Sequence, residues 1–211
     1  MKYGFTSIGI SMLALASIGC SGSAFAGNAV ANGSLESFIF DMAQAPGIGG
    51  AEGCVPKAAG RVTITSLGSV ENMHVEATGL PANSDFDFFV IQVPLSPFGL
   101  SWYMGDMFSD AQGLAVGDFI GRFSIGTFIV APGVAPAPVV DPPNLNDANK
   151  NPATNPVQTY HLGLWFDSPA EAGKAGCATK TTPFNSTHNA GVQILNTSNF
   201  KQGAGPLLFV K

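Results

Sequence analysis

The sequence predicts an all-β protein, a two-sheet antiparallel β-sandwich of the immunoglobulin-like or jelly-roll-like type. Short apolar or alternating runs recur along the chain, turn-forming residues separate them, and stretches with a helical period are scarce. The chain has 26 glycines and 15 prolines, which fit many turns, and 16 phenylalanines, which supply a core. Short strands joined mostly by short turns favour a sandwich over a barrel.

The first predicted strands alternate between apolar and polar residues. Residues 37–42 form the first strand, and a loop rich in Gly, Ala and Pro follows at 43–60. Residues 61–67 and 73–80 each place their apolar side chains on one face, which predicts strands that cover a core. Those side chains are Val62, Ile64, Met73, Val75 and Ala77.

The middle of the chain predicts a central strand followed by a hairpin. Residues 86–93 are apolar on both faces, as in a strand with neighbours on each side. Residues 100–107 form a further strand, and a turn at 110–113 leads back into a strand at 114–120. A short strand follows at 126–130.

The last part of the chain begins with a segment that is dense in Pro and Asn, residues 131–157. Proline lacks a backbone N–H, so this segment predicts a surface loop within a single domain. Residues 160–166 form a strand, and 168–174 one helical turn with Ser168 as its N-cap. Residues 191–195 form the last core strand, before a polar tail.

Residues 1–26 are typical of a secretory signal peptide, which leaves a mature domain at 27–211. Lys2 provides a positive charge, residues 8–18 are apolar, and small side chains precede a cleavage site after Ala26. The apolar stretch is shorter than the roughly 20 residues of a spanning helix, so we expect no transmembrane segment in the mature chain. Lipoprotein processing at Cys20 is the alternative. Both interpretations predict a secreted protein, extracellular or periplasmic.

The other two cysteines, Cys54 and Cys177, predict a disulfide bond. In an oxidising compartment two cysteines of one domain are more often bridged than free. Closing so long a loop stabilises a fold by roughly 4–5 kcal/mol in the chain-entropy model. Two unpaired thiols are the alternative.

The charge content argues against several partners. Only 11% of the residues are charged, the net charge is −5, and Lys and Arg nowhere cluster. We therefore expect no nucleic acid as partner, and an unknown ligand or surface component instead.

The sequence offers no strong metal or cofactor motif, and we expect no cofactor. The three histidines lie far apart, and the aspartates lack the spacing of a calcium loop. We therefore favour ordinary turn chemistry for the aspartates, with a calcium site as the alternative. These residues are His74, His161 and His188, and Asp85, Asp87, Asp106, Asp110 and Asp118.

Aromatic residues form the most interesting candidate site. His161, Gly163 and Trp165 share one face of their strand, and Trp165 above a glycine could offer a flat surface for a sugar or peptide. Trp102, beside Tyr103, is a further candidate. The alternative is that both faces of the strand are covered and Trp165 belongs to the core.

Five sets of residues suggest a relationship: 79–81 with 85–94, 97–103, 121–123 with 127–133, 160–166, and 188–193 with 199–200. Together they resemble a group of uncharacterised secreted bacterial β-rich proteins. The resemblance implies a bacterial source and a self-contained domain, and it carries over no active site.

These observations support three hypotheses. The first is a non-enzymatic protein with a binding or structural role in the envelope or the extracellular space. The second is a secreted hydrolase of polysaccharide or peptide that uses Asp85, Asp87, Asp106 or Asp118. The third is a carbohydrate- or peptide-binding module built on Trp165, His161 and Trp102. The absence of nucleophile-elbow and dinucleotide motifs favours the first.

Overall fold

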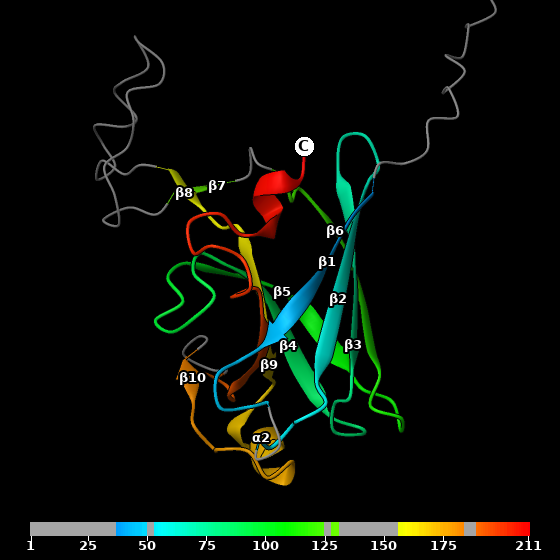
Figure 1. The fold of residues 1–211 in the computed structure, drawn as a ribbon, viewed down its shortest axis with the longest axis vertical. Coiled ribbons are helices and arrows are strands. Elements are labelled where there is room, and N and C mark those ends of the chain that lie inside the picture. The colour runs from blue at the N-terminus through cyan, green and yellow to red at the C-terminus, as the bar shows by residue number, and fades with distance from the viewer. Residues whose placement is uncertain (1–36, 50–52, 125–127, 131–155, 184–188) are drawn as a thin grey trace, which may run out of the picture. The chain divides into compact units, whose positions relative to one another are not determined.

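The structure is a computed structural model that describes residues 37–49, 53–124, 128–130, 156–183 and 189–211 (Figure 1). All of them belong to one compact unit, Ser34–Lys211. The predicted signal peptide, the cysteine at position 20, His188 and most of the Pro/Asn-rich loop lie outside the described residues.

Eight strands form one antiparallel sheet in the order β5-β4-β9-β12-β1-β2-β3-β6. The all-β prediction is confirmed. Two short strand pairs, β7 with β8 and β10 with β11, lie outside this sheet. The strands of the sheet are β1 (Ser37–Gln44), β2 (Ala59–Ser66), β3 (Glu71–Thr78), β4 (Asp85–Ile91), β5 (Ser101–Phe108), β6 (Ala115–Gly121), β9 (His161–Phe166) and β12 (Gln193–Asn196).

The remaining elements are short. They are β7 (Phe128–Val130), β8 (Pro156–Gln158), β10 (Thr182–Pro183), β11 (Asn189–Ala190), the helix α2 (Pro169–Lys174) and a 3-10 helix at Pro206–Phe209. The expectation that 131–157 is a loop throughout is wrong at its end, because β8 pairs there with β7. Pro156 is the first residue of this strand, a position at which the missing backbone N–H of proline costs no hydrogen bond of the sheet.

One strand joins the two halves of the sheet. β1 pairs with β2 along Ser37 to Met42 and with β12 at Ala43 and Gln44. At the ends of the strand order, β5 and β6 are linked by a single bridge between Ser109 and Ala115. Because Phe88 of β4 stacks on Phe119 of β6 with centroids 5.3 Å apart, these ends approach each other, and the sheet is nearly barrel-shaped.

The core follows the predicted alternation. β2 and β3 bury alternate residues, and those residues include every apolar side chain assigned to the inner face. β4 lies between β5 and β9 and buries all its residues after Asp85, so it is central as predicted. Figure 1 shows β2 and β3 on one side and β4, β5 and β9 on the other.

Cys54 and Cys177, the predicted pair, lie at disulfide distance, with 1.95 Å between their Sγ atoms. The bond ties the loop that follows β1 to the segment that follows α2. Among the residues described, no helix has the length and apolar content needed to cross a membrane.

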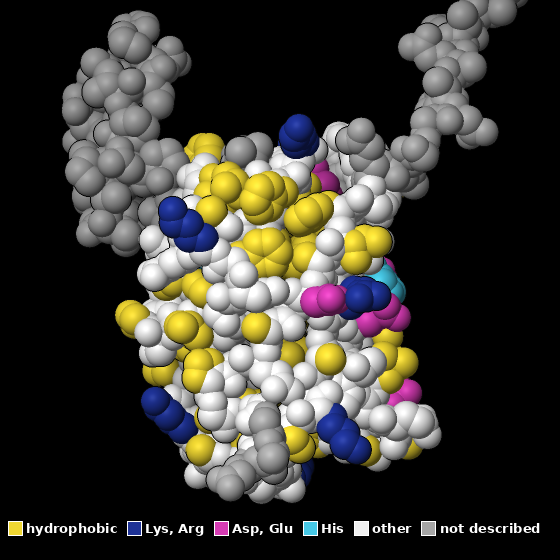
Figure 2. All heavy atoms as spheres, in the orientation of Figure 1, with side chains coloured by type: hydrophobic (Ala, Val, Ile, Leu, Met, Phe, Trp, Pro, Cys, Tyr) yellow, Lys and Arg dark blue, Asp and Glu magenta, His cyan; other side chains and the backbone are white. Residues whose placement is uncertain are grey.

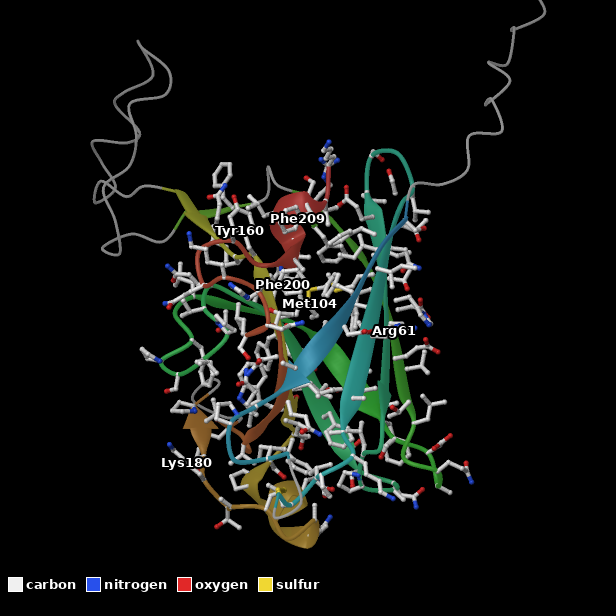
Figure 3. The ribbon with its side chains drawn as sticks, in the orientation of Figure 1. Arg61, Met104, Tyr160, Lys180, Phe200 and Phe209 are labelled. Atoms are coloured by element: carbon white, nitrogen blue, oxygen red, sulfur yellow. A yellow bond between two sulfur atoms is a disulfide. The ribbon has the colours of Figure 1, made fainter. Side chains whose placement is uncertain are left out.

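The prediction of a polar tail after β12 is wrong for the last residues of the chain. Leu207 and Val210 are buried against the main core. Tyr160, Phe200 and Phe209 gather near this 3-10 helix (Figure 3), and the Phe209 ring lies 6.0 Å from that of Phe38. Figure 2 shows hydrophobic side chains at the same end of the visible face, and few charged ones.

Candidate functional site

A groove of about 990 Å³ lies on the outer face of β4, β5, β9 and β12. Alternation along β4 creates it, because Phe86, Phe88 and Val90 point into the main core while Phe89 and Ile91 join a second cluster with Trp165. Three connecting segments form the walls: residues 45–48 after β1, 95–99 between β4 and β5, and 178–183 before and within β10.

Four rings line the groove, and we call them the aromatic cluster: Phe89, Phe98, Tyr103 and Trp165. Phe89 and Phe98 meet the Trp165 ring edge to face, with centroids 5.2 Å and 5.0 Å away. Phe89 also lies 5.5 Å from Tyr103. Such edge-to-face pairs are favourable beyond the area that they bury, so the cluster is a rigid apolar surface.

The loop between β4 and β5 places Phe98 over Trp165. Backbone hydrogen bonds close it: Val93 N–H donates to Phe98 O at 2.9 Å, and Phe98 N–H to Leu95 O at 2.9 Å. Phe98 has a φ of 46°, which is unusual for a bulky residue. These bonds and the contact with Trp165 stabilise that conformation. The loop therefore places the Phe98 ring in the wall of the groove, although the backbone conformation of Phe98 is itself unfavourable.

The Trp165 ring lies directly over Gly163. A Cβ atom at Gly163 would be 2.3 Å from Cζ3 and 2.5 Å from Cη2 of the indole, so only glycine fits below the ring. The side chain of Trp165 is 3% exposed. Trp165 therefore forms part of the groove floor. Of the two interpretations drawn from the sequence, the open platform is not present, and the alternative, in which both faces of the strand are covered, agrees with the burial of Trp165.

Two of the polar side chains at the groove, those of Gln193 and Tyr103, are hydrogen-bonded within the protein. Gln193 donates from Nε2 to Pro94 O at 3.2 Å, and its Oε1 accepts from Asn196 Nδ2 at 3.0 Å. The Tyr103 hydroxyl donates to the Asp106 carboxylate. In contrast, the buried indole N–H of Trp165 has no hydrogen-bond partner among the described residues.

Lys180 is the only charged side chain among the described residues that line the groove. It is exposed and lies beside β10 (Figure 3). The ion pairs found between described residues involve other groups. The groove is thus apolar, with one cationic group at its wall.

A carboxylate cluster adjoins the groove through Tyr103. Asp87, Asp106 and Asp167 each place an oxygen within 4.8 Å of the others. Asp87 is buried, Asp167 is partly buried and Asp106 is exposed. This is the only group of three or more candidate metal ligands found in the part of the chain that the structure describes.

Two groups beside the carboxylate cluster, Asp85 and Tyr103, have raised pKa values. Loss of solvation raises the pKa of the neighbouring Asp85 carboxyl, and the negative charges of Asp167, Glu171 and Asp106 raise it further. The pKa of the Tyr103 hydroxyl is raised by loss of solvation and by its hydrogen bond to Asp106. Negative charge therefore concentrates at this end of the outer face.

The structure does not bring the three predicted ligand-binding residues together. His161 is fully buried, with Nδ1 2.9 Å from Thr197 Oγ1 and Nε2 2.9 Å from Gln202 O. Trp102 is 38% exposed, but it leans on Phe123 and does not line the groove. Of the three, Trp165 alone contributes to the site.

The other acidic and histidine candidates are also separated. His74 lies on β3 and its Nδ1 is 2.8 Å from Asp118 on β6, in the other half of the sheet. That hydrogen bond lowers the pKa of the Asp118 carboxyl. Asp110 accepts hydrogen bonds from Gln112 N–H and Leu114 N–H, the turn chemistry expected of it.

Sequence reasoning missed most of the groove. Phe89, Phe98, Lys180 and Asp167 were not singled out, and Tyr103 was noted only as a neighbour of Trp102. The burial of both faces of β4 was visible, but the pairing of Asp87 with Trp165 and of Phe89 with Gly163 depends on β9, a distant segment of the chain.

Comparison of the chain with protein-family models and with curated proteins finds no match.

Proposed function

We propose that the protein is a secreted or surface-associated, non-enzymatic binding protein whose ligand occupies the groove over the aromatic cluster. One observation carries this proposal: a groove of about 990 Å³ lined by packed aromatic rings and closed by three segments. Pockets of this size with mostly apolar walls and few polar groups are the usual form of ligand sites.

A panel of glycans, peptides and lipids tests the proposal, with two matched variants. Ala178 is exposed at the groove wall and Ala170 is exposed on α2, away from the groove. We expect Ala178→Phe to abolish binding of the ligand that the panel identifies, and Ala170→Phe to leave it unchanged. Equal binding by both variants, or no ligand in the panel, would contradict a groove site.

Export is part of the proposal. The cysteine pair at disulfide distance supports an oxidising compartment, and the resemblance to secreted bacterial β-rich proteins supports a bacterial source. Sequencing the N-terminus of the protein recovered from its native compartment should give a chain that begins at Gly27. A chain that starts at Met1, or a lipid on Cys20, would contradict this processing.

We also propose that the two halves of the sheet pack as the layers of a sandwich. The change of partner along β1 and the contact of Phe88 with Phe119 support it.

The carboxylate cluster supports a second candidate, a hydrolase. Two carboxylates about 5 Å apart can act as acid and nucleophile on a glycosidic bond, and Asp87, Asp106 and Asp167 lie within such a range. Glycan hydrolysis that Asp106→Asn abolishes would favour this candidate. Because Asp87 is fully buried, we rank it second.

A further inference from the structure

We infer that the groove binds an extended peptide in which a large apolar residue is followed, two positions later, by an arginine or lysine. This inference rests on the proposed function, because it concerns the same groove. Three observations carry it: the apolar floor of the groove, the carboxylate cluster that adjoins the groove through Tyr103, and the spacing of these two features along β4.

The apolar floor and the carboxylate cluster lie on the same face of β4, two residues apart. Phe89 packs in the outer cluster of the groove floor, and Asp87 belongs to the carboxylate cluster. Their partners on β5 repeat this order, since Tyr103 pairs with Phe89 and Asp106 with Asp87. Alternate residues of a strand share a face about 6–7 Å apart. A ligand that uses both features therefore carries an apolar group and a polar group at this distance from each other.

Charge complementarity identifies that polar group as a cation. Carboxylates whose oxygens lie within 4.8 Å of one another repel, and a positive group beside them offsets this repulsion. Asp85 and Glu171 add negative charge at the same end of the outer face, where the Lys174 amine is already bonded to Glu171. The four aspartates at this end outnumber the single amine of Lys180 on the groove wall. Asp106 is the exposed member of the cluster, so a ligand can reach it.

Tyr103 stands at the junction of the groove and the cluster. It lines the groove, its side chain is 38% exposed, and its hydroxyl donates to Asp106. An aromatic ring attracts a cation to its face, and the carboxylate beside it accepts charged hydrogen bonds. Arginine suits this junction better than lysine, because its planar guanidinium stacks on a ring and bonds a carboxylate with two N–H groups.

Hydroxyl groups along the groove favour a peptide backbone between the apolar and the cationic group. They belong to Ser96, Ser101, Thr181 and Thr182, and they make no hydrogen bond within the part of the chain that the structure describes. Each can donate and accept, which suits the N–H and C=O groups of an extended peptide. In such a peptide, residues two positions apart share a face at the spacing found on β4. A neutral sugar could use the same hydroxyls, but it brings no positive charge to the carboxylate cluster.

The probe is a heptapeptide with blocked ends that has leucine at its third position, arginine at its fifth, and glycine or serine elsewhere. One control replaces the arginine with citrulline, which keeps the shape and removes the charge. A second control moves the arginine to the fourth position, where it points to the opposite face of an extended peptide.

Calorimetric titrations of the mature chain, with its disulfide intact, compare the three peptides. We expect the probe to bind about fivefold more tightly than the citrulline peptide, as for a well-placed exposed ion pair. It should also bind more tightly than the peptide with arginine at the fourth position. Most of the advantage over citrulline should disappear in about 1 M salt, which screens exposed charges.

Asp106→Asn tests the carboxylate, because it removes the charge and keeps an acceptor for the Tyr103 hydroxyl. We expect it to weaken the probe about threefold to fivefold and to leave the citrulline peptide unchanged. Glu76→Gln is the matched control, since it removes the same charge from an exposed position of β3, in the other half of the sheet, and should change neither affinity. A wild-type fold in each variant, checked by far-UV and near-UV circular dichroism, separates lost contacts from lost structure.

The outcomes distinguish the inference from the proposed function. If the citrulline peptide binds as tightly as the probe, or if Asp106→Asn and Glu76→Gln act alike, the cation is overturned. Equal binding of the peptide with arginine at the fourth position overturns the extended geometry. If a glycan or lipid binds in a way that Ala178→Phe abolishes while none of the peptides binds, the ligand class is overturned and the groove site remains. Binding of the probe that Ala178→Phe leaves intact overturns both.

Discussion

At the scale of single residues, His161 shows how a candidate site residue is used for structure. Leu162 N–H donates to Thr197 Oγ1, whose hydroxyl can donate to His161 Nδ1, while His161 Nε2–H donates to the carbonyl of Gln202. With these donors and acceptors the imidazole is neutral and carries its proton on Nε2. The side chain therefore joins β9 to the C-terminal segment and is not available to a ligand.

The burial of His161 predicts an acid-sensitive fold. Burial lowers its pKa below the ordinary value of 6.5, so as the pH falls the unfolded chain takes up this proton first. The stabilisation is complete above about pH 6.5 and declines as the pH falls toward the folded pKa. We expect urea midpoints to fall between pH 7.5 and pH 5.5 in the wild type.

His161→Gln should reduce this pH dependence, and at pH 7.5 it should cost about 1–3 kcal/mol through lost buried hydrogen bonds. Ser69→Ala, at an exposed side chain that does not titrate, serves as the control and should keep the wild-type difference between the two pH values. An unchanged pH dependence in His161→Gln would show that another group is responsible.

Gly163 shows how one small residue sets the groove floor. Gly163→Ala would place a Cβ atom 2.3 Å from the Trp165 ring, which Phe89 and Phe98 hold on its other sides. We expect a loss of about 1–3 kcal/mol in unfolding free energy, as for overpacking in a core. Denaturant unfolding measures it.

Two further variants make the Gly163 prediction specific. Gly203→Ala is the matched control, because a Cβ atom there would meet nothing within 4 Å, and its stability should stay near that of the wild type. Adding Trp165→Leu to Gly163→Ala should recover part of the loss. If the double variant is destabilised by the sum of the single effects, the clash with the indole is not the cause.

At the scale of elements, the short helix α2 begins and ends where its sequence indicates. Ser168 Oγ accepts a hydrogen bond from Glu171 N–H at 3.2 Å, and Pro169 occupies the first helical position. Glu171 and Lys174 form an ion pair along the helix. Because α2 leads into Cys177 and then the groove wall, its cap helps to position that wall.

Ser168→Ala should therefore destabilise the fold by about 1 kcal/mol, the usual value of a lost N-cap. Ser168→Asp should keep most of the stability, because a carboxylate also caps and suits the helix N-terminus. Ser69→Ala, at an exposed serine whose hydroxyl makes no hydrogen bond among the described residues, should have no effect. Thermal unfolding followed by circular dichroism measures all three.

At the scale of the whole molecule, the disulfide connects two walls of the groove. Cys54 is followed by Val55, whose N–H donates to Ile48 O at 3.1 Å and so holds the wall at 45–48. Cys177 is followed directly by Ala178 and the wall that carries Lys180. The bond thus stabilises the unit and also limits movement of the walls.

We expect no free thiols when the mature, unreduced chain is titrated in denaturant. The double variant Cys54→Ala with Cys177→Ala should lose about 4 kcal/mol of unfolding free energy in the chain-entropy model. Two titratable thiols, or a double variant as stable as the wild type, would contradict a structural role for this bond.

The sequence by itself determined the class of the fold and most strand positions, because alternation and turn residues act locally. It also indicated the α2 cap and the cysteine pair, since few other pairings exist. Only the tertiary structure decided the strand order β5-β4-β9-β12-β1-β2-β3-β6 and the change of partner along β1. The groove depends on that order, because Phe89 meets Trp165, and Asp87 meets Asp106, only when β9 and β5 flank β4. Such contacts join residues that are distant in the chain, and no local pattern specifies which strand edges will meet.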